Sequence, residues 1–270
     1  MTVQIAHMTD IHLDWIPGDE ADAARAALAD VPAGAPIVLT GDIATCPTFA
    51  ESLLAFAEGC DGRTIYFVLG NHDAWQGSIA DSRARAALLT RKHPQLVYLP
   101  AASKIVELSP ETALVGVNGW YDGRAGNVHG SSVRLNDWIL IEELRGLHRD
   151  RRLEVLLDIA SKYAQLAQWE LKEALEHHQH VILATHVPPF PEAAVSPYGP
   201  SDPDYLPWFT NVTLGFQLLA TAGSYLDRQI TVLCGHSHGG ADIAVTPNLR
   251  VITGAAEYGN PRVSGLHAFP

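Results

Sequence analysis

The chain has 270 residues, of which 47% are hydrophobic and 18% are charged. This composition is typical of a globular protein with a sizeable core, and it excludes a disordered or fibrous chain. The net charge of −12 argues against a broad nucleic-acid surface, because such surfaces collect Lys and Arg. No apolar run approaches the roughly 18 residues of a membrane span, and no leader pattern is visible. We therefore expect a cytoplasmic protein with no membrane partner.

Three units of strand and helix are predicted in the first third of the chain. Apolar segments typical of buried strands occupy residues 3–9, 36–40 and 64–69. Helical patterns follow them near 20–29, 48–58 and 82–91. This alternation implies parallel strands whose C-terminal ends share one edge of a sheet, and ligands bind at that edge in α/β proteins.

The rest of the chain is predicted to continue as one domain over residues 1–270. Short strands are expected at 96–98, 104–108, 112–117, 180–185 and 229–234, with hairpin-like strands around 243 and 251. The pattern over 133–178 predicts two helices broken near 146–151. We expect a helical insertion at about 119–163 and a Pro-rich loop at about 188–212, both longer than the core requires.

Polar residues that can bind metals follow five of the predicted strands. They are Asp10 with His12, Asp42, Asn71 with His72, His186, and His236 with His238. In extended backbone, residues two apart point the same way, so Asp10 and His12 can face one ion. Imidazole, carboxylate and amide oxygen together suit Mn, Fe, Zn, Co or Ni rather than Ca. Glycines at 41, 70 and 235 are expected to let the backbone turn sharply at these ends.

Five sequence blocks resemble the calcineurin-like metallophosphoesterases. In order, they are Asp10-Ile11-His12, Gly41-Asp42, Gly70-Asn71-His72-Asp73, Thr185-His186 and Gly235-His236-Ser237-His238. The branch that the chain most resembles contains cyclic-nucleotide and glycerophosphodiester phosphodiesterases. The resemblance implies an α/β fold, a four-layer α-β-β-α sandwich with two mixed β-sheets and two metal ions at one edge.

The resemblance also implies a role for each residue of the five blocks. Asp10, His12, Asp42 and His238 would hold the first ion. Asp42 would bridge to a second ion, completed by Asn71, His186 and His236. A hydroxide between the ions would attack phosphorus in line. His72 would face the substrate, stabilise developing charge and protonate the leaving oxygen, while Asp73 would orient the His72 imidazole.

Substrate contacts are predicted in the loop that follows residues 112–117. Asn118, Trp120, Tyr121 and His129 are candidates to line a substrate pocket, with ordinary loop packing as the alternative. Tyr198, Tyr205, Trp208 and Phe209 follow His186, and we interpret them as aromatics that anchor the Pro-rich loop to the core rather than as a lid.

The predicted function is hydrolysis of a phosphodiester or phosphomonoester of a small molecule by a binuclear metal centre. Nucleic acid is not expected as a partner, given the acidic balance of the chain. Two alternatives remain open: a nuclease of the same family, and a non-catalytic scaffold that binds protein. The identity of the metals, the preference between diester and monoester, and the oligomeric state stay open from the sequence.

Overall fold

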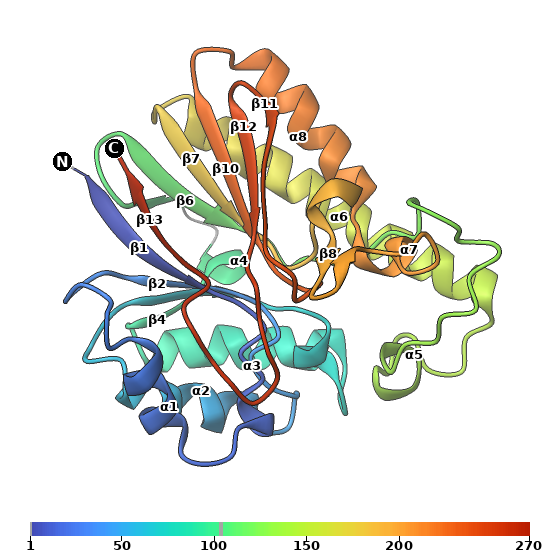
Figure 1. The fold of residues 1–270 in the computed structure, drawn as a ribbon, viewed down its shortest axis with the longest axis horizontal. Helices are drawn as coiled ribbons and strands as arrows, with labels where there is room; N and C mark the ends of the chain where they lie inside the picture. The colour runs from blue at the N-terminus through green and yellow to red at the C-terminus, as the bar shows by residue number, and fades with distance from the viewer. Residues whose placement is uncertain (1, 103–104) are drawn as a thin grey trace.

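A computed structural model describes residues 2–102 and 105–270 of the chain. Two large β-sheets lie face to face in the centre, and helices cover the outer face of each sheet (Figure 1). Both termini lie at one end of the molecule, where the first and last strands pair. This arrangement confirms the predicted α/β fold with two mixed sheets.

The first sheet is built by the early strand-and-helix units. In chain order its strands are β1 (Val3–Met8), β2 (Ile37–Thr40), β3 (Ile65–Val68), β4 (Leu96–Tyr98) and β13 (Gly265–Phe269). The first four are parallel, and β13 returns antiparallel to β1 at the edge. Its outer face is covered by α1 (Glu20–Ala27), α2 (Phe49–Glu58) and α3 (Ile79–Lys92).

The second sheet is built by the second half of the chain. Its order is β11 (Ala241–Thr246), β12 (Leu249–Thr253), β10 (Gln229–Cys234), β7 (His180–Ala184), β6 (Thr112–Gly116) and β5 (Val106–Glu107). The four inner strands are parallel, and the two edge strands are antiparallel. Its outer face is covered by α6 (Arg149–Leu175) and α8 (Val212–Ser224).

Three clusters of buried apolar side chains hold these layers together. One cluster lies between the two sheets and includes Ile5, Val38, Val68, Ile182 and Leu233. Since side chains alternate along a strand, the opposite faces of the same strands pack against the helices in the other two clusters. The four layers follow from this, because each sheet buries one face against the other sheet and one face against helices.

The region from 119 to 163 differs from the predicted helical insertion. Its first part has little regular structure and ends in the single turn α5 (Asp137–Leu140), which lies to one side of the layers. The expected break near 146–151 does fall just before α6, where Gly146 takes a positive φ of 75°. However, α6 is one helix of 27 residues that packs against β6 and β7, so it belongs to the core layers.

Several short elements complete the fold. The Pro-rich loop contains a small hairpin of β8 (Val195–Ser196) and β9 (Gly199–Pro200), followed by α7 (Leu206–Phe209). The helix α4 (Leu99–Ala102) follows β4. Single 3₁₀ turns occur at Leu13–Trp15, His72–Ala74 and Pro191–Ala193. Lys104, the first residue of the strand predicted at 104–108, lies outside the described residues.

Candidate metal centre

The C-terminal ends of five parallel strands converge on one site between the two sheets. Asp10 and His12 follow β1, Asp42 follows β2, and Asn71 follows β3. From the second sheet, His186 follows β7, and the pair at 236 and 238 follows β10. All seven predicted ligands are brought to this edge. Their role as metal ligands stays a prediction, which the geometry below supports.

The backbone at most of these residues is left-handed. Five of the seven have φ between 39° and 70°: Asp10, His12, Asp42, His236 and His238. This conformation costs a residue with a side chain about 1–2 kcal/mol, so it persists where the surroundings impose it. The expectation that Asp10 and His12 share a direction because the backbone is extended is therefore wrong. Their side chains do meet, but left-handed turns after β1 bring them together.

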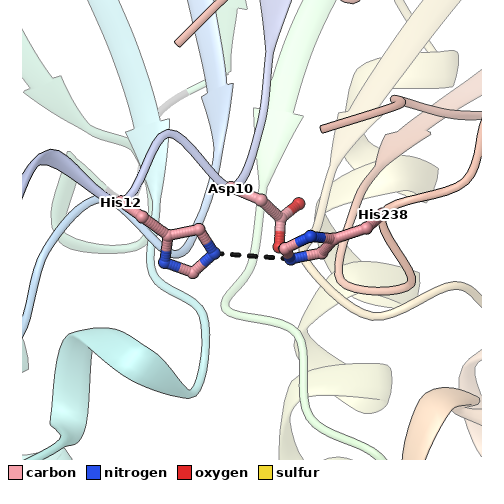
Figure 2. A group of neighbouring side chains, drawn as sticks. All are labelled: Asp10, His12 and His238. Atoms are coloured by element: carbon pink, nitrogen blue, oxygen red, sulfur yellow. Dashed lines mark hydrogen bonds and ion pairs between the residues drawn. The ribbon is translucent and has the colours of Figure 1, made fainter. Parts of the chain in front are cut away.

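Asp10, His12 and His238 form the first group (Figure 2). The Nε2 atom of His238 lies 3.3 Å from Oδ1 of Asp10 and 3.4 Å from Nε2 of His12. The other carboxylate oxygen of Asp10 accepts hydrogen bonds from the Thr9 hydroxyl and the His236 backbone N–H, at 2.6 and 2.9 Å. These two bonds fix the carboxylate so that its Oδ1, which has no hydrogen-bond donor among the described residues, faces the two imidazoles.

Two histidines of the second group have tautomers that their backbone partners determine. Nδ1 of His186 lies 2.7 Å from the carbonyl oxygen of Thr40, and Nε2 of His236 lies 2.9 Å from the carbonyl oxygen of Trp208. A carbonyl can only accept, so each of these nitrogens carries the proton. In the neutral rings, Nε2 of His186 and Nδ1 of His236 therefore each carry a lone pair.

Those two lone pairs point into the same small space as two oxygens. Nε2 of His186 is 3.1 Å from Nδ1 of His236, 3.1 Å from Oδ1 of Asn71 and 3.3 Å from Oδ1 of Asp42. The Asn71 oxygen faces this point because its amide nitrogen donates to Asp137 at 2.9 Å. Four acceptor atoms thus meet with no donor between them. A cation with mixed nitrogen and oxygen ligands fits this arrangement, and a hydrogen-bond network among neutral groups does not.

The electrostatics of the free protein lead to the same conclusion. Burial opposes a charge on His186, yet the adjacent carboxylate of Asp42 outweighs it and raises the pKa of His186 to about 10. Burial also opposes a charge on His238, but its contact with the Asp10 carboxylate raises the pKa of that ring. Protons on these two imidazoles can offset the buried carboxylates of Asp10 and Asp42 in the free protein. The residues present therefore fit positively charged ions.

Close contacts between segments explain two of the glycines in the motifs. A Cβ atom on Gly70 would collide with the Asp42 carboxylate and lie 2.7 Å from Nε2 of His186. A Cβ atom on Gly235 would collide with the side chains of Thr9 and Asp10. Neither glycine has a positive φ in the structure, so the expected reason, a sharp turn, is wrong for these two positions. They are glycines because the ligands on neighbouring strands occupy the space.

His72 faces the pocket as predicted, but Asp73 does not orient it. The Asp73 carboxylate instead accepts four backbone hydrogen bonds, from residues 42, 43, 44 and 70, at 2.7–3.1 Å. The His72 ring lies on the indole of Trp75, with ring centroids 3.4 Å apart, and its Nε2 is 3.8 Å from Asp42. Burial lowers the pKa of His72 to about 3, so the ring is neutral at pH 7 in the free protein. A neutral ring can offer a hydrogen bond, and the role of His72 as a proton donor stays a prediction.

The four predicted substrate residues do not line the pocket beside the metal centre. The Asn118 side chain is buried between the backbone N–H of Leu69 and the hydroxyls of Tyr98 and Tyr163. Trp120 and Tyr121 belong to the apolar core, and His129 is exposed elsewhere. The alternative, ordinary loop packing, is correct for the buried three, because their side chains pack into the core behind the metal centre rather than facing the cavity.

The pocket is a cavity of about 1420 Å³ that opens directly onto the metal centre. Its floor includes Asp42, Asn71 and His236, and its walls come from three loops: 134–137, 195–209 and 255–262. The Pro-rich loop therefore does more than anchor itself. Of its aromatics, Trp208 is buried in the core, as predicted, but Tyr198, Tyr205 and Phe209 line the cavity.

Two further residues at the site were not identified from the sequence. Asp137, at the start of α5, is buried and accepts hydrogen bonds from Asn71, Trp75 and Tyr121 at 2.7–2.9 Å. Tyr258 packs its ring 4.4 Å from His12 and 4.8 Å from His238. Neither lies in a strand-end block. An Asp directly before the Trp-Ile-Leu run at 138–140 is the one local signal that a buried carboxylate enters here.

Comparison with known protein families agrees with the geometry of the metal centre. Residues 3–240 match the calcineurin-like phosphoesterase family. The chain belongs to this family. Its members are binuclear metal enzymes, so membership supports metal-dependent hydrolysis of a phosphoester, in agreement with the three overlapping His/Asp groups, one of which joins His12, Asp42 and His72. No curated protein matches the chain.

Solved structures with a similar fold have little sequence in common with the chain. The protein TT1561 of Thermus thermophilus is 13% identical over 100% of this chain and 99% of its own, with a TM-score of 0.56. A dimetal phosphatase from Danio rerio is 15% identical over 94% of this chain and 87% of its own, with a TM-score of 0.57. At such low identities the likeness shows the fold alone.

Within the described residues, no helix is both long and apolar enough to cross a membrane.

Proposed function

We propose that the chain hydrolyses a phosphodiester or phosphomonoester of a small molecule, using two metal ions held by the seven residues of the metal centre. The single observation that carries the proposal is the convergence of four atoms, from His186, His236, Asn71 and Asp42, that are all acceptors when both imidazoles are neutral. Mn, Fe, Zn, Co and Ni suit this ligand set. Such ions supply Lewis acidity toward a phosphoryl oxygen and a nucleophilic water at neutral pH.

The chain's own residues would perform three tasks in this reaction. Asp42 contacts ligands of both groups, so its carboxylate can join them. Asp137 fixes the Asn71 amide so that its oxygen faces inward. His72, held between Trp75 and Asp42, can offer a hydrogen bond to a phosphoryl or leaving oxygen that enters the pocket. The buried surroundings strengthen each of these contacts, because water competes less there.

A small-molecule substrate is favoured over a long nucleic acid by the charge of the chain. A net charge of −12 repels an extended phosphate backbone, whereas the cavity beside the metal centre can accept a single small anion once cations are bound. We place the reaction in the cytoplasm, as the sequence predicts.

The test is hydrolysis of bis(p-nitrophenyl) phosphate and p-nitrophenyl phosphate by the purified chain loaded with Mn, Fe, Zn or Co. We expect release of p-nitrophenolate with at least one ion, and loss of activity on chelation that returns when metal is added back. The ratio of the two rates assigns diester or monoester preference. Metal-replete protein that hydrolyses neither compound, nor any ester in a panel of cyclic nucleotides and glycerophosphodiesters, would contradict the proposal.

A further inference from the structure

The cavity is much larger than a phosphoryl group with a small alcohol requires. At about 1420 Å³ it exceeds the roughly 300–1,000 Å³ of common small-molecule pockets. The metal centre occupies one end of it, and the three wall loops extend the space beyond. The features of these walls, and not the shared metal ligands, must therefore select the organic part of the substrate.

Two arginines on separate walls bring positively charged side chains to the cavity. Arg134 enters from the loop before α5, and Arg262 from the loop before β13. Both are exposed, and in residues 2–102 and 105–270 neither has a carboxylate within ion-pair distance. The carboxylates on the same walls are engaged within their own loops: Asp202 accepts from the backbone of Asp204, and Glu257 from the side chain of Asn260.

Most arginines of the chain have no ion-pair partner among the described residues, so the position of Arg134 and Arg262 in the cavity, rather than their lack of a partner, points to a ligand. A guanidinium presents a planar fork of donors that matches the oxygens of a phosphate. The scissile phosphoryl group belongs at the metal centre, so these arginines are free to bind a second anionic group of the same molecule.

Exposed aromatic rings stand beside these charges. Tyr198, Tyr205 and Tyr258 line the cavity, with 99%, 49% and 46% of their surfaces exposed. Tyr258 packs one side against His12 at the metal centre, next to the position of the scissile group. Large exposed rings grouped in one concave site are typical of ligand contact, and their faces stack well on flat heterocycles.

Resting on the hydrolase function proposed above, we propose that the substrate is a nucleotide carrying a second phosphate in addition to the one that is hydrolysed. The scissile phosphate binds at the metal centre, the base stacks on the tyrosines, and Arg134 with Arg262 bind the second phosphate. Hydrolysis adds water across one P–O bond, giving a phosphate and an alcohol, and needs no further reactant.

A ladder of three p-nitrophenyl esters tests each recognition step with one leaving group. The first is methyl p-nitrophenyl phosphate, the second is the p-nitrophenyl ester of thymidine 5′-phosphate, and the third is that ester with an added 3′-phosphate. We expect kcat/KM to rise about tenfold at each step, since a stacked base and a charge-assisted hydrogen bond each contribute that much. Equal values for the second and third esters would overturn the proposal.

Variants assign the preferences to residues. Arg134→Gln with Arg262→Gln should remove most of the gain from the 3′-phosphate and leave methyl p-nitrophenyl phosphate hydrolysis within about twofold, because neither arginine touches the metal ligands. Tyr198→Leu with Tyr205→Leu should remove most of the gain from the base. Arg91→Gln with Lys92→Gln removes the same two charges at the exposed end of α3, outside the cavity, and should change neither ratio. A double arginine variant that keeps the full gain would overturn the assignment.

Calorimetry separates failure of this proposal from failure of the hydrolase function. If neither the ladder nor p-nitrophenyl phosphate is hydrolysed, the proposed function fails, but binding still tests the cavity. Manganese-loaded protein should then bind thymidine 3′,5′-bisphosphate about tenfold more tightly than thymidine 5′-phosphate, and the double arginine variant should bind both alike. Equal affinities in the unaltered protein would overturn the second-phosphate proposal.

Discussion

Nε2 of His186 lies 3.1 Å from Nδ1 of His236. The tautomers are fixed from behind, because each ring donates its other N–H to a backbone carbonyl, on Thr40 and Trp208. Two strands from different parts of the chain thus place Nε2 of His186 against the Nδ1 lone pair of His236. In the metal-free protein the raised pKa of His186 puts a proton on Nε2, and a metal cation would take the place of that proton.

The first prediction is that His236→Ala removes one of two bound ions. Metal analysis after loading with Mn should fall from about two ions per chain to about one. Activity should fall at least roughly 100-fold, because altering even the partners of ligands costs about 10–100-fold. His129→Ala is the matched control, since His129 is exposed and lies outside the cavity. Loss of activity in the His129 variant instead would show that the loop after β6 does contact substrate.

The second prediction concerns Asp137, which acts through Asn71. Asp137→Asn keeps the size of the side chain but removes the charge that holds the Asn71 amide and the Trp75 indole, at 2.9 and 2.7 Å. We expect the affinity for the more weakly held ion to fall about 10–100-fold, measured by competition with a chelator. Activity should recover at high metal concentration, which a simple loss of folding would not allow.

Tyr121→Phe provides the control for this variant. It removes the third hydrogen bond to Asp137, at 2.8 Å, and leaves the contacts to Asn71 and Trp75 in place. Metal affinity should therefore stay within about threefold of the unaltered protein, with a stability loss of about 1 kcal/mol from the missing bond. Equal loss of metal affinity in both variants would show that the whole Asp137 network, rather than its hold on Asn71, determines binding.

Much of the metal centre could be predicted because it depends on local patterns. Short apolar runs that stop at Asp10, Asp42 or His186 mark strand ends, and parallel topology sends those ends to one edge. The same rules predict the two mixed sheets. The left-handed backbone at Asp10 and His12 escaped prediction because tertiary contacts impose it, and sequence spacing alone implies the more common extended form.

The pocket walls could not be predicted because loops that are far apart in the sequence form them. Tyr258 reaches His12 since β12 and β13 belong to different sheets and the loop between them crosses the site. No periodic pattern encodes such a crossing. Asn118 shows the converse: it was correctly placed at a strand end, but Tyr98 and Tyr163 turn its side chain into the core. The sequence pattern also did not predict helix α8, because the Gly and Thr residues of this helix weaken the helical pattern.

The third prediction separates the roles of Asp73 and His72. Asp73→Asn places an amide NH₂ against two backbone N–H donors that now bond to a carboxylate oxygen, for example those of Asp42 and Gly70. We expect the free energy of unfolding to fall by about 3 kcal/mol, measured by urea denaturation of metal-free protein. His72→Gln should change stability by less than about 1 kcal/mol and lower kcat at least tenfold. An Asp73→Asn variant with normal stability and an altered pH–rate profile would instead support the prediction that Asp73 orients the His72 imidazole.

The fourth prediction uses Glu170, a buried carboxylate on α6 remote from the metal centre. Its side chain is 6% exposed, and its Oε2 has no hydrogen-bond partner among the described residues. Burial raises the pKa of Glu170 to about 7, partly opposed by a hydrogen bond from the backbone of Gly116. The folded protein therefore favours the protonated acid, whereas the unfolded chain ionises near the ordinary value of 4.5.

The sign of the pH dependence follows from that difference. The protonated Glu170 contributes fully to the free energy of unfolding below pH 4.5, and this contribution is lost as the pH rises toward 7. Above pH 7 the folded protein holds an unpaired buried charge. Glu170→Gln carries no titrating proton, so it should match the unaltered protein near pH 4.5 and exceed its unfolding free energy at pH 8 by up to about 3 kcal/mol. Urea denaturation at both pH values measures this. Glu173→Gln is the control, because Glu173 lies on the exposed side of the same helix, and it should show no such gain. A Glu170→Gln variant that gains no stability at pH 8 would mean that the Glu170 carboxylate is ionised and solvated in the folded state.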